Sequence, residues 1–306
     1  MAYFYTAYGL QFRSDLLLPE CLPGTGENID FEIVLTSFPG VKSRPTNIYR
    51  RGIRATSGTD AAGHLYLSWE GVADYQALNG RTLRVQPRTE EADLLSLFTL
   101  SEALGLILFQ RGMYLLHASA VQVGAEAWCF MGTPGAGKST TAAAFVQAGC
   151  PLLSDDLTAL RFDEQGRAQI IPGFPQLKIW DTTAEGLRYD PALLTPISEG
   201  INKFAFQPTA NFPQVPIELG AIYFLHRARN RPARQVVSPV EVPMETLKYF
   251  PLPKQFLNQP TIKKLFTQSL QCARTVPICR MRRPADFAAL QAWVALSVEA
   301  SKPLVV

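Results

Sequence analysis

One short glycine-rich stretch carries residue types that can bind a phosphate group. It reads Gly-Thr-Pro-Gly-Ala-Gly-Lys-Ser over residues 132–139 and fits G-x-x-x-x-G-K-[ST] at every fixed position. An apolar run precedes it at residues 127–131, and a helix-forming run follows at residues 140–148. This order is typical of a P-loop, in which backbone N–H groups and a helix N-terminus hold an anion. A glycine-rich turn without chemistry is the alternative interpretation.

Within a P-loop, each polar residue has a distinct task. Lys138 would reach the β- and γ-phosphates of a nucleoside triphosphate, and the Ser139 hydroxyl would bind Mg²⁺. The sequence therefore predicts ATP or GTP as the ligand, together with Mg²⁺.

Two adjacent carboxylates, Asp155 and Asp156, end the first apolar strand expected after the P-loop helix. Neighbouring side chains at a strand end point to opposite faces, so the two acids can do different work. One can help to hold Mg²⁺, and the other can accept a proton from an attacking hydroxyl. A solvated turn between two strands is the alternative. The later apolar strand at residues 221–225 ends in His226-Arg227 and offers no carboxylate.

His117 is one of three histidines and lies in the apolar strand expected before the P-loop strand. A histidine in such a strand is most often a core residue. Its position along the strand nevertheless predicts that the His117 side chain lies near the phosphate loop.

Composition limits the classes of partner. The net charge of +3 over 306 residues is too small to indicate nucleic acid or a membrane surface. The five cysteines show no C-x-x-C spacing, and Cys129, Cys150 and Cys279 lie in or beside apolar runs as buried thiols. No signal peptide is visible, and we expect a cytoplasmic protein. The apolar stretch 94–109 contains Ser, Thr and Glu, which favours a buried helix over a membrane span.

The expected architecture is α/β, with a β-rich module over residues 1–88 and a nucleotide-binding domain over residues 89–306. Alternating runs at 31–36 and 63–69 predict strands in the first part, and a long helix is expected over 90–110. We expect one strand at 114–123 and a second at 127–131. Residues 172–216 read as irregular, with a short helix around 197–206. Two late helices are expected at 261–274 and 284–300, with Pro284 in the first turn of the second.

The residues 117–156 resemble the core of HPr serine kinase/phosphorylase and, more distantly, of ATP-dependent phosphoenolpyruvate carboxykinase. The three segments that carry the resemblance are His-Ala-Ser-Ala-Val at 117–121, the loop at 132–140 and Leu-Ser-Asp-Asp at 153–156. Most similar are the HPr-kinase-like proteins of peptide natural-product clusters, including lasso-peptide kinases that phosphorylate a serine of a precursor peptide. The resemblance covers roughly residues 90–300 and implies an HPr-kinase-type fold.

The resemblance implies roles for individual residues. It implies Asp155 as the acid/base for the acceptor hydroxyl, Asp156 beside the metal with His117 near it, and Lys203 as a basic residue that touches phosphate during transfer. It implies a nucleotide site made of Gly132, Thr133, Pro134, Gly135, Ala136, Gly137, Lys138, Ser139 and Thr140. The stretch 176–181 lacks the Glu and Arg-Gly signature of true HPr kinases, so HPr itself and the reverse phosphorolysis are not implied.

Three functions compete at this stage. The first is a Mg²⁺-dependent kinase that moves the γ-phosphoryl group of ATP to a serine or threonine of a peptide or small protein, bound near segment 172–216 and the arginine-rich residues 227–234. The second is a nucleotide-gated binding module without phosphoryl transfer, and the third is a small-molecule hydroxyl kinase. An oligomer is compatible with each of them.

Overall fold

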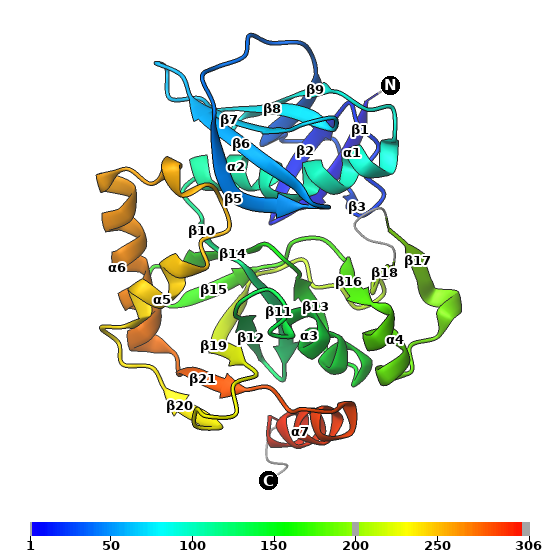
Figure 1. The fold of residues 1–306 in the computed structure, drawn as a ribbon, viewed down its shortest axis with the longest axis vertical. Coiled ribbons are helices and arrows are strands. Elements are labelled where there is room, and N and C mark those ends of the chain that lie inside the picture. Colours follow the sequence, from blue (N-terminus) through cyan, green and yellow to red (C-terminus); the bar gives the residue numbers. More distant parts are fainter. Residues whose placement is uncertain (1, 198–201, 302–306) are drawn as a thin grey trace.

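The computed structural model describes residues 2–197 and 202–301, and these form a mixed α/β fold (Figure 1). Two nine-stranded sheets and one three-stranded sheet account for the described strands. The expected α/β class is therefore confirmed. In Figure 1 the first large sheet lies above the second, and a helical segment lies between them.

The first sheet contains every described strand before residue 88, in the order β3-β1-β2-β4-β9-β8-β7-β6-β5. Along β2, the side chains of Leu10, Phe12 and Ser14 are buried while their neighbours are half-buried, as expected for a strand with one face on a core. The strands predicted at 31–36 and 63–69 correspond to β4 and β7. The bounds are β1 (Tyr3–Ala7), β2 (Leu10–Ser14), β3 (Leu22–Pro23), β4 (Phe31–Leu35), β5 (Arg44–Arg50), β6 (Ile53–Thr59), β7 (Leu65–Trp69), β8 (Ala73–Leu78) and β9 (Thr82–Pro87).

The predicted long helix is present but broken. It consists of α1 (Ala92–Phe98), a π-helical turn η1 (Thr99–Ala103) and α2 (Leu104–Gln110), with non-helical backbone angles at Ser101. The stretch Ala92–Gln110 is long and apolar enough to cross a membrane, but 78% of its most apolar window is buried inside the protein. Burial to that extent is what a core helix shows.

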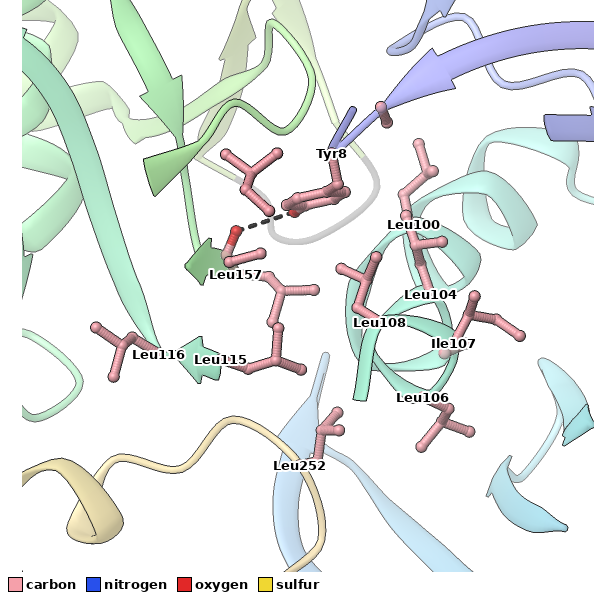
Figure 2. Packing of buried hydrophobic residues seen from close by; sticks show 14 of the residues in the cluster. Tyr8, Leu100, Leu104, Leu106, Ile107, Leu108, Leu115, Leu116, Leu157 and Leu252 are labelled. Carbon is pink, nitrogen blue, oxygen red and sulfur yellow. Dashed lines mark hydrogen bonds between the residues drawn. The ribbon is translucent and has the colours of Figure 1, made fainter. Parts of the chain in front are cut away.

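This helical segment joins the two large sheets through one continuous core. Figure 2 shows Leu108 of α2 on the side of the helix that faces Leu115, in a strand of the second sheet, and Leu157, just before another of its strands. On its other side, the Phe98 ring packs edge-on against Trp69 of the first sheet with centroids 5.1 Å apart. A shared core ties residues 1–88 to the rest of the chain, while the domain boundary at 88/89 stays a prediction.

The second sheet has the order β10-β14-β15-β19-β12-β11-β13, and β21 pairs with β19 and β20. The strand predicted at 114–123 is two strands, because the chain leaves one partner and joins another at His117. The bounds are β10 (Tyr114–Leu116), β11 (Ala118–Val123), β12 (Glu126–Met131), β13 (Leu152–Ser154), β14 (Thr158–Phe162), β15 (Ala168–Ile171), β19 (Ile217–His226), β20 (Arg234–Val236) and β21 (Ile278–Arg282). Since β12, β19 and β21 are parallel, their carboxyl ends meet at one edge.

The segment predicted to be irregular contains a small sheet of its own, in the order β16-β18-β17. The helix predicted around 197–206 is wrong where it can be assessed, because Lys203–Phe206 pairs with Leu177–Trp180 as a strand; residues 198–201 lie outside the described residues. The alternation of Phe204 and Phe206 is as compatible with a strand as with a helix. Pairing with a neighbouring strand decides which of the two forms. The bounds are β16 (Leu177–Trp180), α4 (Asp181–Leu187), η2 (Pro191–Leu193), β17 (Leu194–Pro196) and β18 (Lys203–Phe206).

The remaining helices surround the second sheet, and the one that follows the glycine loop packs against its interior strands β11 and β12 (Figure 1). Side-chain caps fix where two of them begin. The Asn258 side chain accepts a hydrogen bond from the first turn of α6, and the Asp286 side chain does the same for α7. Pro284 therefore precedes the cap and does not lie in the first turn, which corrects the predicted start. The bounds are α3 (Lys138–Gln147), α5 (Val242–Lys248), η3 (Lys254–Phe256), α6 (Gln259–Thr275) and α7 (Phe287–Ala300).

Candidate active site

The glycine loop, residues 132–139, connects β12 to α3 at the edge where the parallel strands end. Gly132, Gly135 and Gly137 have φ values of +147°, +78° and +100°, which side chains with a Cβ rarely adopt. A Cβ on Gly132 would lie 2.7 Å from the carbonyl oxygen of Leu225. The first N–H groups of a helix have no intrahelical partner, and Gly137 has no side chain to cap them. The loop therefore offers an uncapped helix N-terminus to an anion.

Lys138 starts α3 and bends back over the glycine loop. Its side chain is buried, and its Nζ donates a hydrogen bond to the Gly132 carbonyl oxygen at 3.2 Å. Burial lowers the pKa of Lys138, although the nearby carboxylates of Asp156 and Asp155 oppose that shift. A buried ammonium under the loop adds to the pull on an anion.

Asp155 is held from three directions. Its Oδ1 accepts hydrogen bonds from the hydroxyls of Ser119 at 2.5 Å and Ser139 at 2.9 Å, and its Oδ2 accepts one from the backbone N–H of Lys178 at 3.0 Å. Burial, and then the charge of Asp156, raise the pKa of Asp155. This carboxylate is fixed directly against the serine of the glycine loop.

Asp156, the next residue, has a φ of +64°, in the left-handed region of backbone conformation. Its Oδ2 lies 2.6 Å from the Nζ of Lys178. Burial alone would raise the pKa of Asp156, but Lys178, Lys203 and Arg50 outweigh it and hold that pKa well below its ordinary range. The two acids therefore have different partners, although both contact Lys178, Asp155 through its backbone N–H and Asp156 through its Nζ.

A cavity of about 860 Å³ opens in front of Asp156. The first sheet forms one wall through β5, an edge strand. The other walls are loops beside strands of the second sheet, the break in the helical segment, β16 and β18 of the small sheet, and the 248–255 segment. Arg50 of β5 makes an ion pair with Glu102 at 3.3 Å, at the break in the helical segment. The ionisable and polar lining residues include Arg50, Ser101, Glu102, His117, Asp156, Lys203, Lys248, Lys254 and Gln255.

His117 occupies the break between β10 and β11 and lines this cavity. Its backbone N–H donates to the carbonyl oxygen of Tyr249 at 3.3 Å. Burial, and next the charge of Lys138, lower the pKa of His117 from 6.5 to about 4. The imidazole is therefore neutral at pH 7. Among the described residues, no group of three or more His, Cys, Asp or Glu side chains is placed to hold a metal ion.

Most of the residues proposed from the sequence converge here. Ser139 donates to Asp155, Lys138 donates to the Gly132 carbonyl oxygen, and His117, Asp156 and Lys203 line the cavity. The Lys203 Nζ also lies 5.5 Å from the ring centroid of Trp180. Within the loop, Thr133, Pro134 and Gly135 are exposed and Ala136 is buried. Thr140 shares its hydroxyl hydrogen bond with Thr183 at 3.1 Å, so any contact with phosphate would come from its backbone.

Several residues of the site escaped the sequence reasoning. Lys178 is a cation between the apolar Leu177 and Ile179, a pattern that could have marked it. Ser119 lies within the His-Ala-Ser-Ala-Val segment, but its contact with Asp155 depends on the pairing of β11 with β13. Arg50 and Glu102 come from distant parts of the chain and gave no local signal.

The arginine-rich residues 227–234 lie elsewhere. None of these described residues lines the cavity. Instead, the Arg282 guanidinium donates to the carbonyl oxygens of Ala228 at 3.1 Å and Arg229 at 2.9 Å, which fixes this loop against β21. The cavity therefore gives no support to the expectation that this loop takes part in acceptor binding.

Comparisons with known proteins add little to this geometry. A scan against protein-family models found no match, and a search of curated proteins found none either. Among solved structures, the chain is similar to the HPr(Ser) kinase/phosphatase from Coxiella burnetii, at 11% sequence identity and a TM-score of 0.31. The match covers 61% of this chain and 94% of that chain. A TM-score this low gives no basis for transferring a site, so the proposals below depend on this chain's own contacts.

Proposed function

We propose that the protein is an ATP-dependent phosphotransferase that phosphorylates a serine or threonine hydroxyl of a peptide or small protein. One observation carries the proposal. Asp155 contacts the serine of the glycine loop, and its neighbour Asp156 faces a cavity large enough for an acceptor. The phosphate-binding loop, Asp155 on the metal side and Asp156 on the acceptor side would then lie in that order. Phosphoryl transfer requires such an order.

The glycine loop would bind the nucleotide phosphates through its backbone N–H groups, the N-terminus of α3 and Lys138. Ser139 and Asp155 would hold the Mg²⁺ that accompanies ATP, which supplies charge neutralisation at the β- and γ-phosphate oxygens. One carboxylate and one hydroxyl suffice, because Mg²⁺ in such sites takes its other oxygen ligands from phosphate and water. These residues fit the predicted ligand.

In the transfer step, the acceptor oxygen attacks the γ-phosphorus and the bond to the β,γ-bridging oxygen breaks, which releases ADP. We assign the proton of the acceptor hydroxyl to Asp156 and not to Asp155, the reverse of the sequence-based roles. Asp155 already accepts two hydroxyls and one N–H, and it does not line the cavity. A low pKa makes Asp156 a weak base, but a loose transition state needs chiefly a positioned hydroxyl.

The acceptor would enter between β5 and the 248–255 segment. Lysines and Arg50 outnumber the two carboxylates, Glu102 and Asp156, among the lining residues, so acidic residues beside the acceptor hydroxyl are favoured. An extended peptide suits a cavity that a sheet edge forms on one side. This gives the first sheet a role in acceptor binding.

The test compares Asp156→Asn with Asp155→Asn, using Mg·ATP and acidic serine peptides read by mass spectrometry. We expect Asp156→Asn to lower the transfer rate about 10²–10³-fold while the Kd for Mg·ATP changes less than about threefold. Asp155→Asn should instead raise the Mg²⁺ concentration needed for half-maximal rate by about 10–100-fold.

The opposite pattern would restore the roles given from the sequence. Tight ATP binding without any phosphorylated product, from peptides or from a panel of hydroxylated metabolites, would support the nucleotide-gated module. A phosphorylated metabolite without phosphopeptide would make the protein a small-molecule kinase.

A further inference from the structure

Arg283 is a buried cation, and two of its side-chain nitrogens lack partners. It follows β21 directly and is 7% exposed. Neither its Nε nor its Nη1 has a hydrogen-bond partner among the described residues, while its backbone N–H donates to the His226 carbonyl oxygen at 3.0 Å. Buried guanidinium nitrogens without partners are rare, because desolvation of a charged donor is costly. Such a group calls for an explanation.

The side chain lies against the glycine loop. A Cβ placed on Gly137 would be 2.4 Å from the Arg283 Cδ and 2.8 Å from its Nε. Gly137 is the residue immediately before the first turn of α3, whose N–H groups have no partner within the helix. The guanidinium and the helix N-terminus therefore share the same small volume.

This volume is on the side of the loop away from the carboxylates. In the sheet, β11 and β13 lie on one side of β12, and β19 and β21 lie on the other (Figure 1). Asp155 and Asp156 follow β13, whereas Arg283 follows β21 and does not line the cavity. The terminal phosphate must face the acceptor cavity, so Arg283 can meet only the inner phosphates.

The charge nearest to Arg283 has the same sign as its own. Burial lowers the pKa of Arg283, and the charge of Arg227 lowers it further. Among the described contacts of Arg283, no carboxylate balances the charges of these two arginines. We therefore expect an anionic ligand to bind at this end of the strands.

We propose that Arg283 binds the α- and β-phosphates of the nucleotide and makes the site selective for ligands that carry a diphosphate. This inference rests on the proposed nucleotide binding but not on phosphoryl transfer. A planar guanidinium can donate two hydrogen bonds to one phosphate group, which lysine cannot reproduce.

The experiment measures the Kd of Mg·ATP, Mg·ADP and AMP by titration calorimetry for the wild type and for Arg283→Met. We expect the Kd of ATP and of ADP to rise by the same factor, about 10-fold or more, because both ligands lose the same contacts. AMP, which lacks the β-phosphate, should lose less. Arg229→Met removes an equal charge from the exposed neighbouring loop and should leave all three Kd values within about twofold.

Two outcomes overturn the proposal. Unchanged Kd values for ATP and ADP would make Arg283 a packing residue, and a loss for ATP alone would place it at the γ-phosphate. If Arg283→Met does not fold, Arg283→Lys keeps the charge and should still raise the Kd of both nucleotides. A wild type that binds nucleotide without transferring phosphate would end the proposed function while leaving this inference open to the same measurement.

Discussion

The two sides of the glycine loop are built in opposite ways. On the β13 side, the charges already have partners: Asp155 accepts three hydrogen bonds, and Asp156 is paired with Lys178 at 2.6 Å. On the β21 side, Arg283 is as buried as Asp155, yet two of its nitrogens have no partner among the described residues. One side is complete before a ligand arrives, and the other is not.

The difference indicates which groups the protein positions and which the ligand must satisfy. Carboxylates that orient a hydroxyl or a metal ion need fixed geometry, and hydrogen bonds within the protein supply it. A cation contributes most to phosphate binding when the protein gives it no carboxylate partner, because such a carboxylate would compete with the phosphate for the cation. In the proposed function, the loop thus separates an acceptor side with fixed partners from a cation side whose partners the ligand would supply.

Lys138 stands between the two sides, and replacing it gives the largest expected effect. We expect Lys138→Met to lower phosphoryl transfer by about 10³-fold, because the variant loses a preorganised charge beside the phosphates. The free energy of unfolding without nucleotide should change by no more than about 1 kcal/mol, since methionine fills the volume and a buried cation is removed. Kinetic assays and denaturant unfolding measure both quantities. A large loss of stability would mean that the lysine has a structural role and does not serve chiefly to bind phosphate.

Lys178→Met tests whether the β13 side is as tightly paired as its distances suggest. The variant leaves Asp156 without its 2.6 Å partner, so we expect the unfolding free energy to fall by about 2–3 kcal/mol. That figure lies below the roughly 3–5 kcal/mol of a fully buried pair because the Asp156 side chain is 28% exposed. Thermal unfolding of the matched double variant, Lys178→Met with Asp156→Asn, should recover much of the loss. No recovery would mean that the lysine stabilises the fold by packing alone.

The sequence predicted the complete side better than the incomplete one. Gly132, Lys138, Ser139 and the two aspartates lie within a short span, where fixed spacing on a strand, a turn and a helix determines their geometry. Arg283 contacts the same loop from far along the chain. Only the parallel pairing of β19 with β12 and with β21 brings it there, and no local pattern encodes that pairing.

The fold follows the same rule. Long periodic elements such as α6 were predicted near their true bounds, and the strand run through His117 was mistaken because its break depends on which partner each half finds. Asp155 and Asp156 are neighbours with different partners, and Asp156 has a φ of +64°. Residue types therefore identified the pair, but the direction of each side chain required the structure.

The smallest expected effect concerns His117, which burial and the nearby charge of Lys138 keep neutral. Its pKa is about 4 in the fold and 6.5 as the ordinary value, so the unfolded chain binds more protons between those two pH values. Stability from this group is therefore present above pH 6.5 and is lost as the pH falls toward 4. Between about pH 7.5 and 5.5 the loss should be about 1 kcal/mol. Urea unfolding of the wild type and of His117→Asn at both pH values measures it, and the difference isolates the histidine from the carboxylates that titrate nearby. Parallel pH dependences for the two proteins would mean that the imidazole is already solvated, and that the β13 side of the loop is less closed than its hydrogen bonds indicate.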